Sequence, residues 1–312
     1  MDLRSPRPAH RCPLPDGLSR GHQGDDAIFR LINVHDRAAL EHGGAWYDLA
    51  RLAGDPSLAE PMAAIGRHRE LHAIADRCVE RTADGDVADV TLGPPAPTPR
   101  QVFGIGLNYR DHAGESGMAE PSVPLTFTKF PSCITGPAAD IPLSGSTVDW
   151  EVEIVAVVGR EASHVAPEEA WDAIAGLTLG QDISDRTVQL TDQPPQFSLG
   201  KSFPAYGPIG PAIVSLDALA DRDELVLWCD VDGERMQEGN TRDLIFSIPT
   251  LVAYLSSICT LHPGDLIFTG TPSGVGMARG RFLAAGELLT SGATGIGELA
   301  NRCTPGVGPR SL

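Results

Sequence analysis

A series of short β-type runs, each bounded by Gly, Pro, Asn or Asp, is the feature that most constrains how this chain can fold. The clearest are VFGIG, EIVAVVG, ELVLWCDVDG and DLIFTG. Many short strands and 34 glycines in 312 residues favour a folded-over, barrel-like β architecture over a doubly wound sheet. Helical patterns interrupt the runs at 167–176, where Gly176 is suited to a C-cap, and at 247–261.

A cluster of prolines marks a boundary in the chain. The segment LGPPAPTPR (92–100) carries four prolines, and we place a domain boundary there. We predict a flexible arm over 1–25 and a small N-terminal α+β domain over 26–95, with a helix from about Met62 to Cys78. A larger β-rich domain over 96–303 and a tail over 304–312 complete the predicted organisation.

Charge and cysteine usage exclude several classes of protein. The sequence has 24 Lys+Arg against 41 Asp+Glu, a formal net charge of −17, which repels nucleic acids and anionic membranes. An anionic substrate would therefore need local cations or a bound metal. Six scattered cysteines without CxxC pairs, no signal-like N-terminus and no apolar stretch near 18 residues predict a soluble, cytoplasmic protein with free thiols.

Acidic and apolar residues alternate in DWEVEIV (149–155). On a strand, Glu151 and Glu153 would lie on one face with Cα atoms about 6.5 to 7 Å apart, close enough for both carboxylates to reach one cation. Such oxygen ligands suit Mg²⁺ or Mn²⁺. Asp182, at the end of the run LTLGQD, could be a third ligand. The alternatives are a half-exposed strand that shows Glu to solvent and an Asx-turn at Asp182.

A His-x-x-Glu pair follows VFGIG, within NYRDHAGE (108–115). On one helical turn, Glu115 could orient His112 and raise its basicity, so that the imidazole abstracts a proton from water. Gly114, Gly117 and Pro121 give the segment the composition of an active-site lid. The alternative is a chance surface pair.

Three cations and a glycine-rich turn complete the candidates. Lys129, Lys201 and Arg186 could each neutralise a substrate carboxylate or a developing enolate, and the alternative is that they are ordinary surface residues. Thr269 and Thr271 in DLIFTGTPSGVG offer hydroxyl and N–H groups to an anion. This turn lacks the lysine and the spacing of a P-loop, so it does not indicate nucleotide binding.

These segments, in this order, resemble the fumarylacetoacetate hydrolase family over about residues 100 to 303. The resemblance implies an α+β, β-rich fold, a mixed β-sandwich roll with a small N-terminal α+β domain, and commonly a homodimer. The matching segments are GLNYRDHAGE, FTKFPSCITGP, VDWEVEIVAVVG, GQDISDR, QFSLGKSFPAYGPIGP, DGERMQEGNTRDLIFSIPTLVAYLS, LHPGDLIFTGTPSGVG and FLAAGELLTSGATGIGELAN.

The resemblance also implies residue roles. It implies that Mg²⁺ or Mn²⁺ is held by Glu151, Glu153 and Asp182, and that His112 and Glu115 form a water-activating dyad on a closing lid. Lys201 would stabilise an enolate oxygen. The implied substrate-binding residues are Gln189, Thr271 and, less directly, Arg110 and Lys129.

Two departures from the family pattern concern the identity of the substrate. Relatives often have NDxSARD where this chain has QDISDRT (181–187), and GKSFD where it has GKSFP with Pro204. We expect a metal-dependent hydrolase that cleaves a C–C bond in a 2,4-dioxo acid such as an acylpyruvate or fumarylpyruvate. The alternatives are an oxaloacetate-type decarboxylase or a keto–enol isomerase at the same site, and a non-catalytic protein that binds a keto acid or a partner protein.

Overall fold

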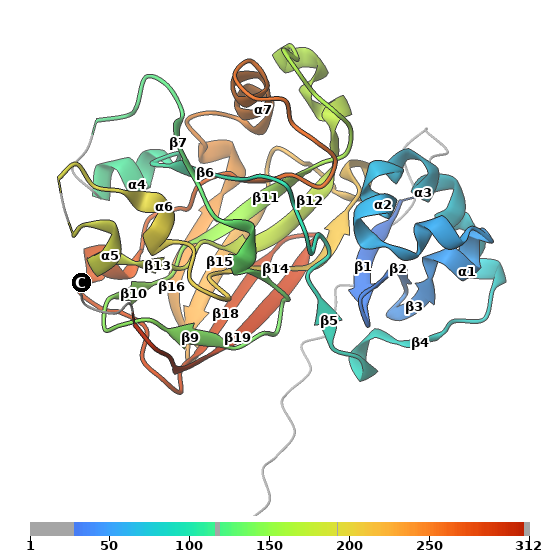
Figure 1. Cartoon of the computed structure of the whole chain (residues 1–312), viewed down its shortest axis with the longest axis horizontal. Helices are drawn as coiled ribbons and strands as arrows, with labels where there is room; N and C mark the ends of the chain where they lie inside the picture. Colours follow the sequence, from blue (N-terminus) through green and yellow to red (C-terminus); the bar gives the residue numbers. More distant parts are fainter. Residues whose placement is uncertain (1–27, 116–118, 192, 309–312) are drawn as a thin grey trace, which may run out of the picture.

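A computed structural model describes residues 28–115, 119–191 and 193–308 (Figure 1). The largest sheet has twelve strands, in the order β4-β3-β2-β1-β14-β12-β11-β17-β6-β7, with β5 paired to β1 and β8 to β14. The strands are β1 (Arg30–Val34), β2 (Arg37–His42), β3 (Ala45–Asp48), β4 (Gly85–Asp86), β5 (Leu92–Gly93), β6 (Val102–Gly106), β7 (Leu125–Thr128), β8 (Ile134–Thr135), β11 (Val152–Val158), β12 (Ile174–Gln181), β14 (Gly207–Val214) and β17 (Leu266–Phe268).

A second sheet of five strands has the order β16-β15-β18-β19-β9, and a short ladder joins β10 to β13. Both large sheets end in free edge strands, so the described residues form a roll of open sheets and not a closed barrel. This confirms the predicted β-rich roll. The strands are β9 (Ile141–Leu143), β10 (Val148–Asp149), β13 (Ser184–Asp185), β15 (Val226–Val231), β16 (Glu234–Asn240), β18 (Leu288–Ala293) and β19 (Gly297–Pro305).

Helices are short in the described residues. The α-helices are α1 (Leu49–Ala53), α2 (Pro61–Gly66), α3 (His68–Ala75), α4 (Arg110–Glu115), α5 (Arg186–Gln189), α6 (Phe197–Gly200), α7 (Ile248–Ser256) and α8 (Gly276–Arg279). The 3₁₀ turns are η1 (Pro56–Ala59), η2 (Asp76–Glu80), η3 (Val87–Asp89), η4 (Pro131–Cys133), η5 (Pro167–Ala173), η6 (Leu216–Ala218) and η7 (Thr241–Asp243). Among these residues no helix is long and apolar enough to cross a membrane.

The helix predicted over 167–176 is wrong at its C-terminal end. The chain makes the 3₁₀ turn η5 over Pro167–Ala173 and then enters β12 at Ile174. Gly176 is not a C-cap but lies inside that strand, where an added Cβ would stand 2.3 Å from the carbonyl oxygen of Val214. Close approach of β14 therefore accounts for this glycine.

The N-terminal unit shares the large sheet. Strand β1 pairs antiparallel with β14, where Arg30 faces Val214 and Leu31 faces Ile213, and this unit lies to one side in Figure 1. The predicted helix over 62–78 is present as α2, α3 and η2. The predicted arm lies outside the described residues, and β19 continues to Pro305.

Strand β11 is buried on both faces. Val152, Ile154, Ala156 and Val158 belong to the core cluster between the two sheets, whereas Val155 and Val157 pack with the apolar residues of the N-terminal unit. Each of its seven residues is buried. The strand that leads out of the acidic segment is therefore a rigid, central support.

The described cysteines, Cys78, Cys133, Cys229, Cys259 and Cys303, are free thiols, as predicted. Cys12 lies outside the described residues.

Candidate functional site

The three predicted carboxylates meet where β11 begins and β12 ends. Glu151 immediately precedes β11, Glu153 is its second residue, and Asp182 directly follows β12. The two strands are antiparallel, with Val152 opposite Gln181, and the Asp182 N–H donates to the Glu151 carbonyl oxygen at 2.8 Å. One oxygen from each carboxylate lies within 4.8 Å of the others.

Burial excludes the half-exposed strand as an explanation of the alternating pattern. Glu151, Glu153 and Asp182 are 7%, 1% and 0% exposed. Carboxylates with so little contact with water need cations or hydrogen-bond donors as partners. The structure therefore shows a buried acidic triad, defined here as these three residues.

Two lysines supply part of that compensation. Lys201 Nζ donates to Glu151 Oε2 at 2.8 Å and to Asp182 Oδ2 at 2.6 Å, while Lys129 Nζ donates to Asp182 Oδ1 at 2.7 Å. Lys129 also donates to the carbonyl of Lys201, which joins the two lysines. Burial alone would lower the pKa of Lys201, but Asp182 and Glu151 outweigh it and raise that pKa, so the ammonium stays charged.

Glu153 is the least compensated member of the triad. Its Oε2 accepts a hydrogen bond from the Gly270 N–H at 2.7 Å, and Oε1 has no donor among the described residues. Burial, followed by the charges of Asp182 and Glu151, raises the pKa of Glu153 well above its usual value. A divalent cation would relieve this repulsion, and three carboxylates are a donor set that suits Mg²⁺ or Mn²⁺. The residues present therefore fit such an ion.

Arg186 supports the triad from a second side. Its Nη2 lies 2.6 Å from Glu151 Oε1, its Nε donates to Asp149 Oδ2 at 2.8 Å, and its Nη1 donates to Gln189 Oε1 at 2.9 Å. Burial favours a higher pKa for Glu151, but Lys201 and Arg186 outweigh it and hold that pKa at about 2. Gln189 is thereby fixed, while its Nε2 has no partner in the described part of the chain.

Asp149 was not identified from the sequence. It is fully buried and accepts hydrogen bonds from the N–H groups of Gly276 at 2.6 Å and Met277 at 2.9 Å. Together with its bond to Arg186, these contacts tie α8 to the triad. The sequence could have indicated Asp149 by its position at the start of the DWEVE pattern.

The predicted dyad lies on α4. His112 Nδ1 stands 3.5 Å from Glu115 Oε2, and Glu115 accepts the Gly274 N–H at 3.0 and 3.1 Å. Asp111 accepts a further bond from the Ser273 hydroxyl at 2.7 Å, so α4 is docked on the turn after β17. His112 is also among the groups whose charge favours the ionised form of Glu151, which places the imidazole near the triad.

Gln237, on β16, is a second residue that was missed. Its Oε1 accepts the Val152 N–H at 3.0 Å, and its Nε2 donates to Thr271 Oγ1 and to the Pro272 carbonyl at 2.8 Å each. Thr271 Oγ1 in turn donates to the Val152 carbonyl at 2.8 Å. One side chain thus joins the ligand-bearing strand to the turn that docks the dyad.

The remaining predicted substrate-binding residues, Thr271 and Arg110, differ in their surroundings. Thr271 is buried, and its hydroxyl holds the turn against β11, as described above. Arg110 begins α4, is exposed and has no side-chain partner among the described residues. Gln181, where the chain departs from the family pattern, accepts the Glu151 N–H at 2.9 Å and donates to Ser291 Oγ at 2.8 Å.

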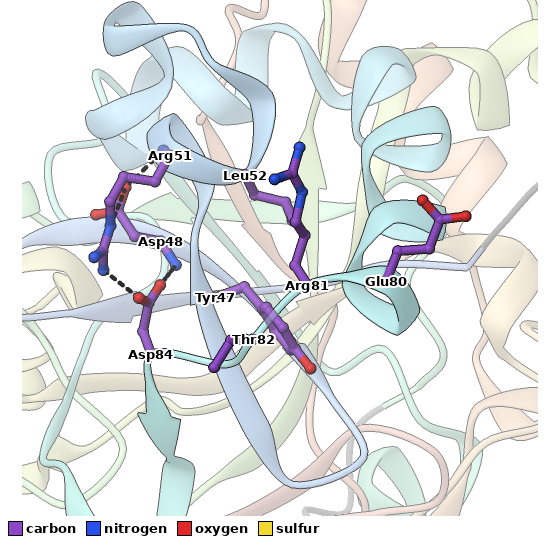
Figure 2. Close-up of a pocket in the computed structure, with 8 residues that line it drawn as sticks. All are labelled: Tyr47, Asp48, Arg51, Leu52, Glu80, Arg81, Thr82 and Asp84. Atoms are coloured by element: carbon purple, nitrogen blue, oxygen red, sulfur yellow. Dashed lines mark hydrogen bonds and ion pairs between the residues drawn. The ribbon is translucent and has the colours of Figure 1, made fainter.

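A separate hollow of about 410 Å³ lies in the N-terminal unit, between β3, α1 and the chain that follows η2 (Figure 2). Figure 2 shows Arg51 turned toward Asp48 and Asp84, with which it forms ion pairs. Arg37 also pairs with Asp48, so the two carboxylates are compensated within the N-terminal unit. Figure 1 shows β3 and α1 on the opposite side of the molecule from α4, α5 and α6. The hollow is therefore not part of the candidate metal centre.

Comparison with known proteins shows the family to which the chain is similar. The model of the fumarylacetoacetate (FAA) hydrolase C-terminal domain matches residues 101–304. A Burkholderia cenocepacia protein, whose name gives only a provisional hydrolase assignment, is 40% identical over 268 residues, which cover 78% of this chain and 95% of that protein.

Two solved structures have the same fold. A Mycobacterium smegmatis protein, provisionally named HpcE, is 44% identical with a TM-score of 0.82, covering 88% of this chain and 99% of that one. Maleylpyruvate hydrolase from Sphingobium sp. SYK-6, solved with manganese(II) and pyruvate, is 27% identical with a TM-score of 0.75, covering 89% and 99%.

Proposed function

Because the chain belongs to the fumarylacetoacetate hydrolase family, we propose that it is a metal-dependent hydrolase that cleaves a C–C bond in a 2,4-dioxo acid of the acylpyruvate type. The observation that carries the proposal is the buried acidic triad beside a His-Glu pair docked on the same turn. A manganese ion and pyruvate in the Sphingobium maleylpyruvate hydrolase support it.

Glu151, Glu153 and Asp182 would hold Mg²⁺ or Mn²⁺. When bound, such an ion supplies Lewis acidity toward the 2-oxo acid end of the substrate and fixes its orientation. The protein contributes a buried, rigid site for it, because β11 and β12 are central strands of the sheet. Arg186 holds the side-chain oxygen of Gln189, which leaves the Nε2 of the same amide available to donate to a substrate oxygen.

His112 is the general base of the proposed reaction. Glu115 orients its ring through Nδ1, which leaves Nε2 to take a proton from water. The separation of 3.5 Å between Nδ1 and Oε2 is long, and closure of α4 over a substrate would shorten it. Water then attacks the distal carbonyl carbon, and the C–C bond to the pyruvate portion breaks.

The leaving group of that step is a carbanion delocalised as an enolate, and Lys201 stabilises it. The Lys201 ammonium stays charged because two carboxylates raise its pKa. Its three N–H groups donate to Glu151, Asp182 and Ser184 Oγ, and a metal held by the two carboxylates would free one of them for an oxygen that gains negative charge. Lys129 bonds to the Lys201 carbonyl and to Asp182, and thus keeps the ammonium in place. Proton return to the enolate carbon completes the two acid products.

Decarboxylation of an oxaloacetate-like acid, or keto–enol isomerisation, would use the same enolate without an attacking water. The docked dyad speaks against decarboxylation, which needs no base, whereas isomerisation could use His112 for its proton transfer. The test is a panel of acylpyruvates and oxaloacetate with added Mg²⁺ or Mn²⁺, followed by mass spectrometry. Hydrolysis gives two acids, whereas CO₂ without a second acid, or a product of unchanged mass, would overturn the assignment.

His112→Ala should lower the rate of hydrolysis in the same assay by about 10²- to 10⁴-fold. His42→Ala is the matched control, because His42 is an exposed residue at the end of β2. The homodimer and the cytoplasmic location stay predictions. Light scattering after size-exclusion chromatography tests the first of them.

A further inference from the structure

A strip of apolar side chains from β7 and α6 borders the metal centre. Strand β7 pairs antiparallel with β6, where Phe127 faces Gly104 and Leu125 faces Gly106. An added Cβ would stand 2.2 Å from the Phe127 ring at Gly104 and 3.2 Å from Leu125 at Gly106. The two side chains therefore lie across β6 in the space that the two glycines leave open.

This strip extends from the end of β6 that leads to α4 toward the triad. The Phe127 ring centroid lies 4.9 Å from Lys201 Nζ, the ammonium that bonds to Glu151 and Asp182. At the other end, β6 leads into α4 with His112. Figure 1 shows α4, β7 and α6 grouped at the same end of the molecule. A substrate held between the dyad and the triad would therefore meet the strip along its length.

Phe197 of α6 extends the strip. Its ring meets Phe127 edge-to-face, with centroids 6.0 Å apart and planes at 78°. Both phenylalanines are half-buried, and Leu125 is 41% exposed. Leu125 and Phe127 lie on the same face of β7, and with Phe197 they present apolar side chains that are still partly open to a ligand.

The cations around the triad are already paired. Lys129, Lys201 and Arg186 bond to carboxylates of the site. Arg279 donates to the carbonyl oxygens of Gly274 and Met236. A carboxylate placed on the apolar strip would lose its hydration without gaining a partner, which is unfavourable. Arg110, exposed at the start of α4, differs from these cations in having no side-chain partner among the described residues.

We infer that Leu125, Phe127 and Phe197 form the wall that receives the distal acyl group, and that the enzyme acts on 2,4-dioxo acids whose distal end is an apolar chain or ring and not a second carboxylate. This inference rests on the proposed function. It deepens that function by naming the class of acyl group.

Two binding probes test the wall without turnover. 2-Oxoheptanoate and 2-oxoheptanedioate have the same chain length, lack the 4-oxo group that cleavage needs, and differ only in a terminal methyl or carboxylate. In calorimetric titrations of the Mg²⁺-loaded protein, the monoacid should bind at least about 10-fold more tightly. Equal or tighter binding of the diacid would overturn the inference.

Variants test whether the wall causes that preference. Phe127→Ala should reduce the preference for the monoacid by about 10-fold or more, whereas Phe127→Leu should keep most of it and guards against misfolding. Phe130→Ala is the matched control, because Phe130 is 51% exposed just beyond β7 and should leave the ratio unchanged. An unchanged ratio in a folded Phe127→Ala, or loss of diacid binding in Arg110→Met with the monoacid unaffected, would overturn the inference.

Turnover measurements distinguish an error in the inferred acyl-group preference from an error in the proposed hydrolase function. The corresponding substrates are 2,4-dioxoheptanoate and 2,4-dioxoheptanedioate, and the first should have the higher kcat/KM by about 10-fold or more. If neither is cleaved although the monoacid binds better, the hydrolase assignment fails and the wall stands. If the diacid is cleaved faster, the hydrolase assignment stands and the wall fails.

Discussion

Replacement of Gln237 by leucine should weaken both the fold and the metal centre. The buried amide makes three hydrogen bonds, to the Val152 N–H, the Thr271 hydroxyl and the Pro272 carbonyl. Leucine has a similar volume but none of these groups, so the Val152 N–H would remain buried and unpaired. Each lost bond costs about 1 kcal/mol and an unpaired buried group about 1–3 kcal/mol. We expect the free energy of unfolding to fall by about 2–4 kcal/mol.

For a chain of this size that loss lowers Tm by roughly 3–6 °C, measured by thermal melting in the presence of chelator. Because Val152 lies between two triad residues, the affinity for Mn²⁺ should also fall, by about 10- to 100-fold, measured by calorimetric titration. Gln101→Leu is the matched control, since the Gln101 amide bonds to the Thr260 carbonyl and to Asp265, away from the triad. A Gln237→Leu protein with wild-type affinity for Mn²⁺ would refute the reasoning.

Three further predictions concern the metal, the dyad and pH. Glu151→Ala should lose the metal and all activity, whereas His112→Ala should keep the metal in an equilibrium dialysis assay and lose about 10²- to 10⁴-fold in kcat; equal metal loss in both would contradict their roles. At a free metal concentration 100 times Kd, the ion should add about 2.7 kcal/mol to the free energy of unfolding. Calorimetric scans with metal and with chelator measure this difference, and identical scans would contradict it. Burial, the largest cause, lowers the pKa of His68 from 6.5. Below about pH 6.5 the unfolded chain therefore binds a proton that the folded chain does not, and the free energy of unfolding should fall as the pH drops. His68→Gln should reduce this pH dependence in urea titrations, and an unchanged dependence would speak against burial of His68 as its cause.

Local sequence pattern predicted how the members of the acidic pair and of the dyad lie relative to each other, but left open whether either is part of a site. The two-residue spacing of Glu151 and Glu153 placed them on one face, and the three-residue spacing of His112 and Glu115 placed them on one helical turn; both arrangements occur in the structure. Asp182 followed from its position at the end of an apolar run. Each of these predictions depends only on the geometry of one element.

What the pattern could not decide depends on contacts between distant segments. The exposure of Glu153 was open, because a strand with one wet face has the same alternation; β11 is covered on both faces by the second sheet and by the N-terminal unit. Gln237 shows no local signal at all, since only the packing of β16 beneath β11 brings its amide to Val152. Gly176 was predicted to end a helix because the nearby backbone of β14 cannot be foreseen from its neighbours.

The central claim is that one divalent ion is shared by Glu151, Glu153 and Asp182. Diffraction from crystals soaked in Mn²⁺, recorded at the manganese absorption edge, tests it most directly. We expect one anomalous peak within coordination distance of an oxygen from each of the three carboxylates, and no such peak in Glu151→Ala. A peak bound elsewhere, or none in the wild-type protein at saturating Mn²⁺, would contradict the account.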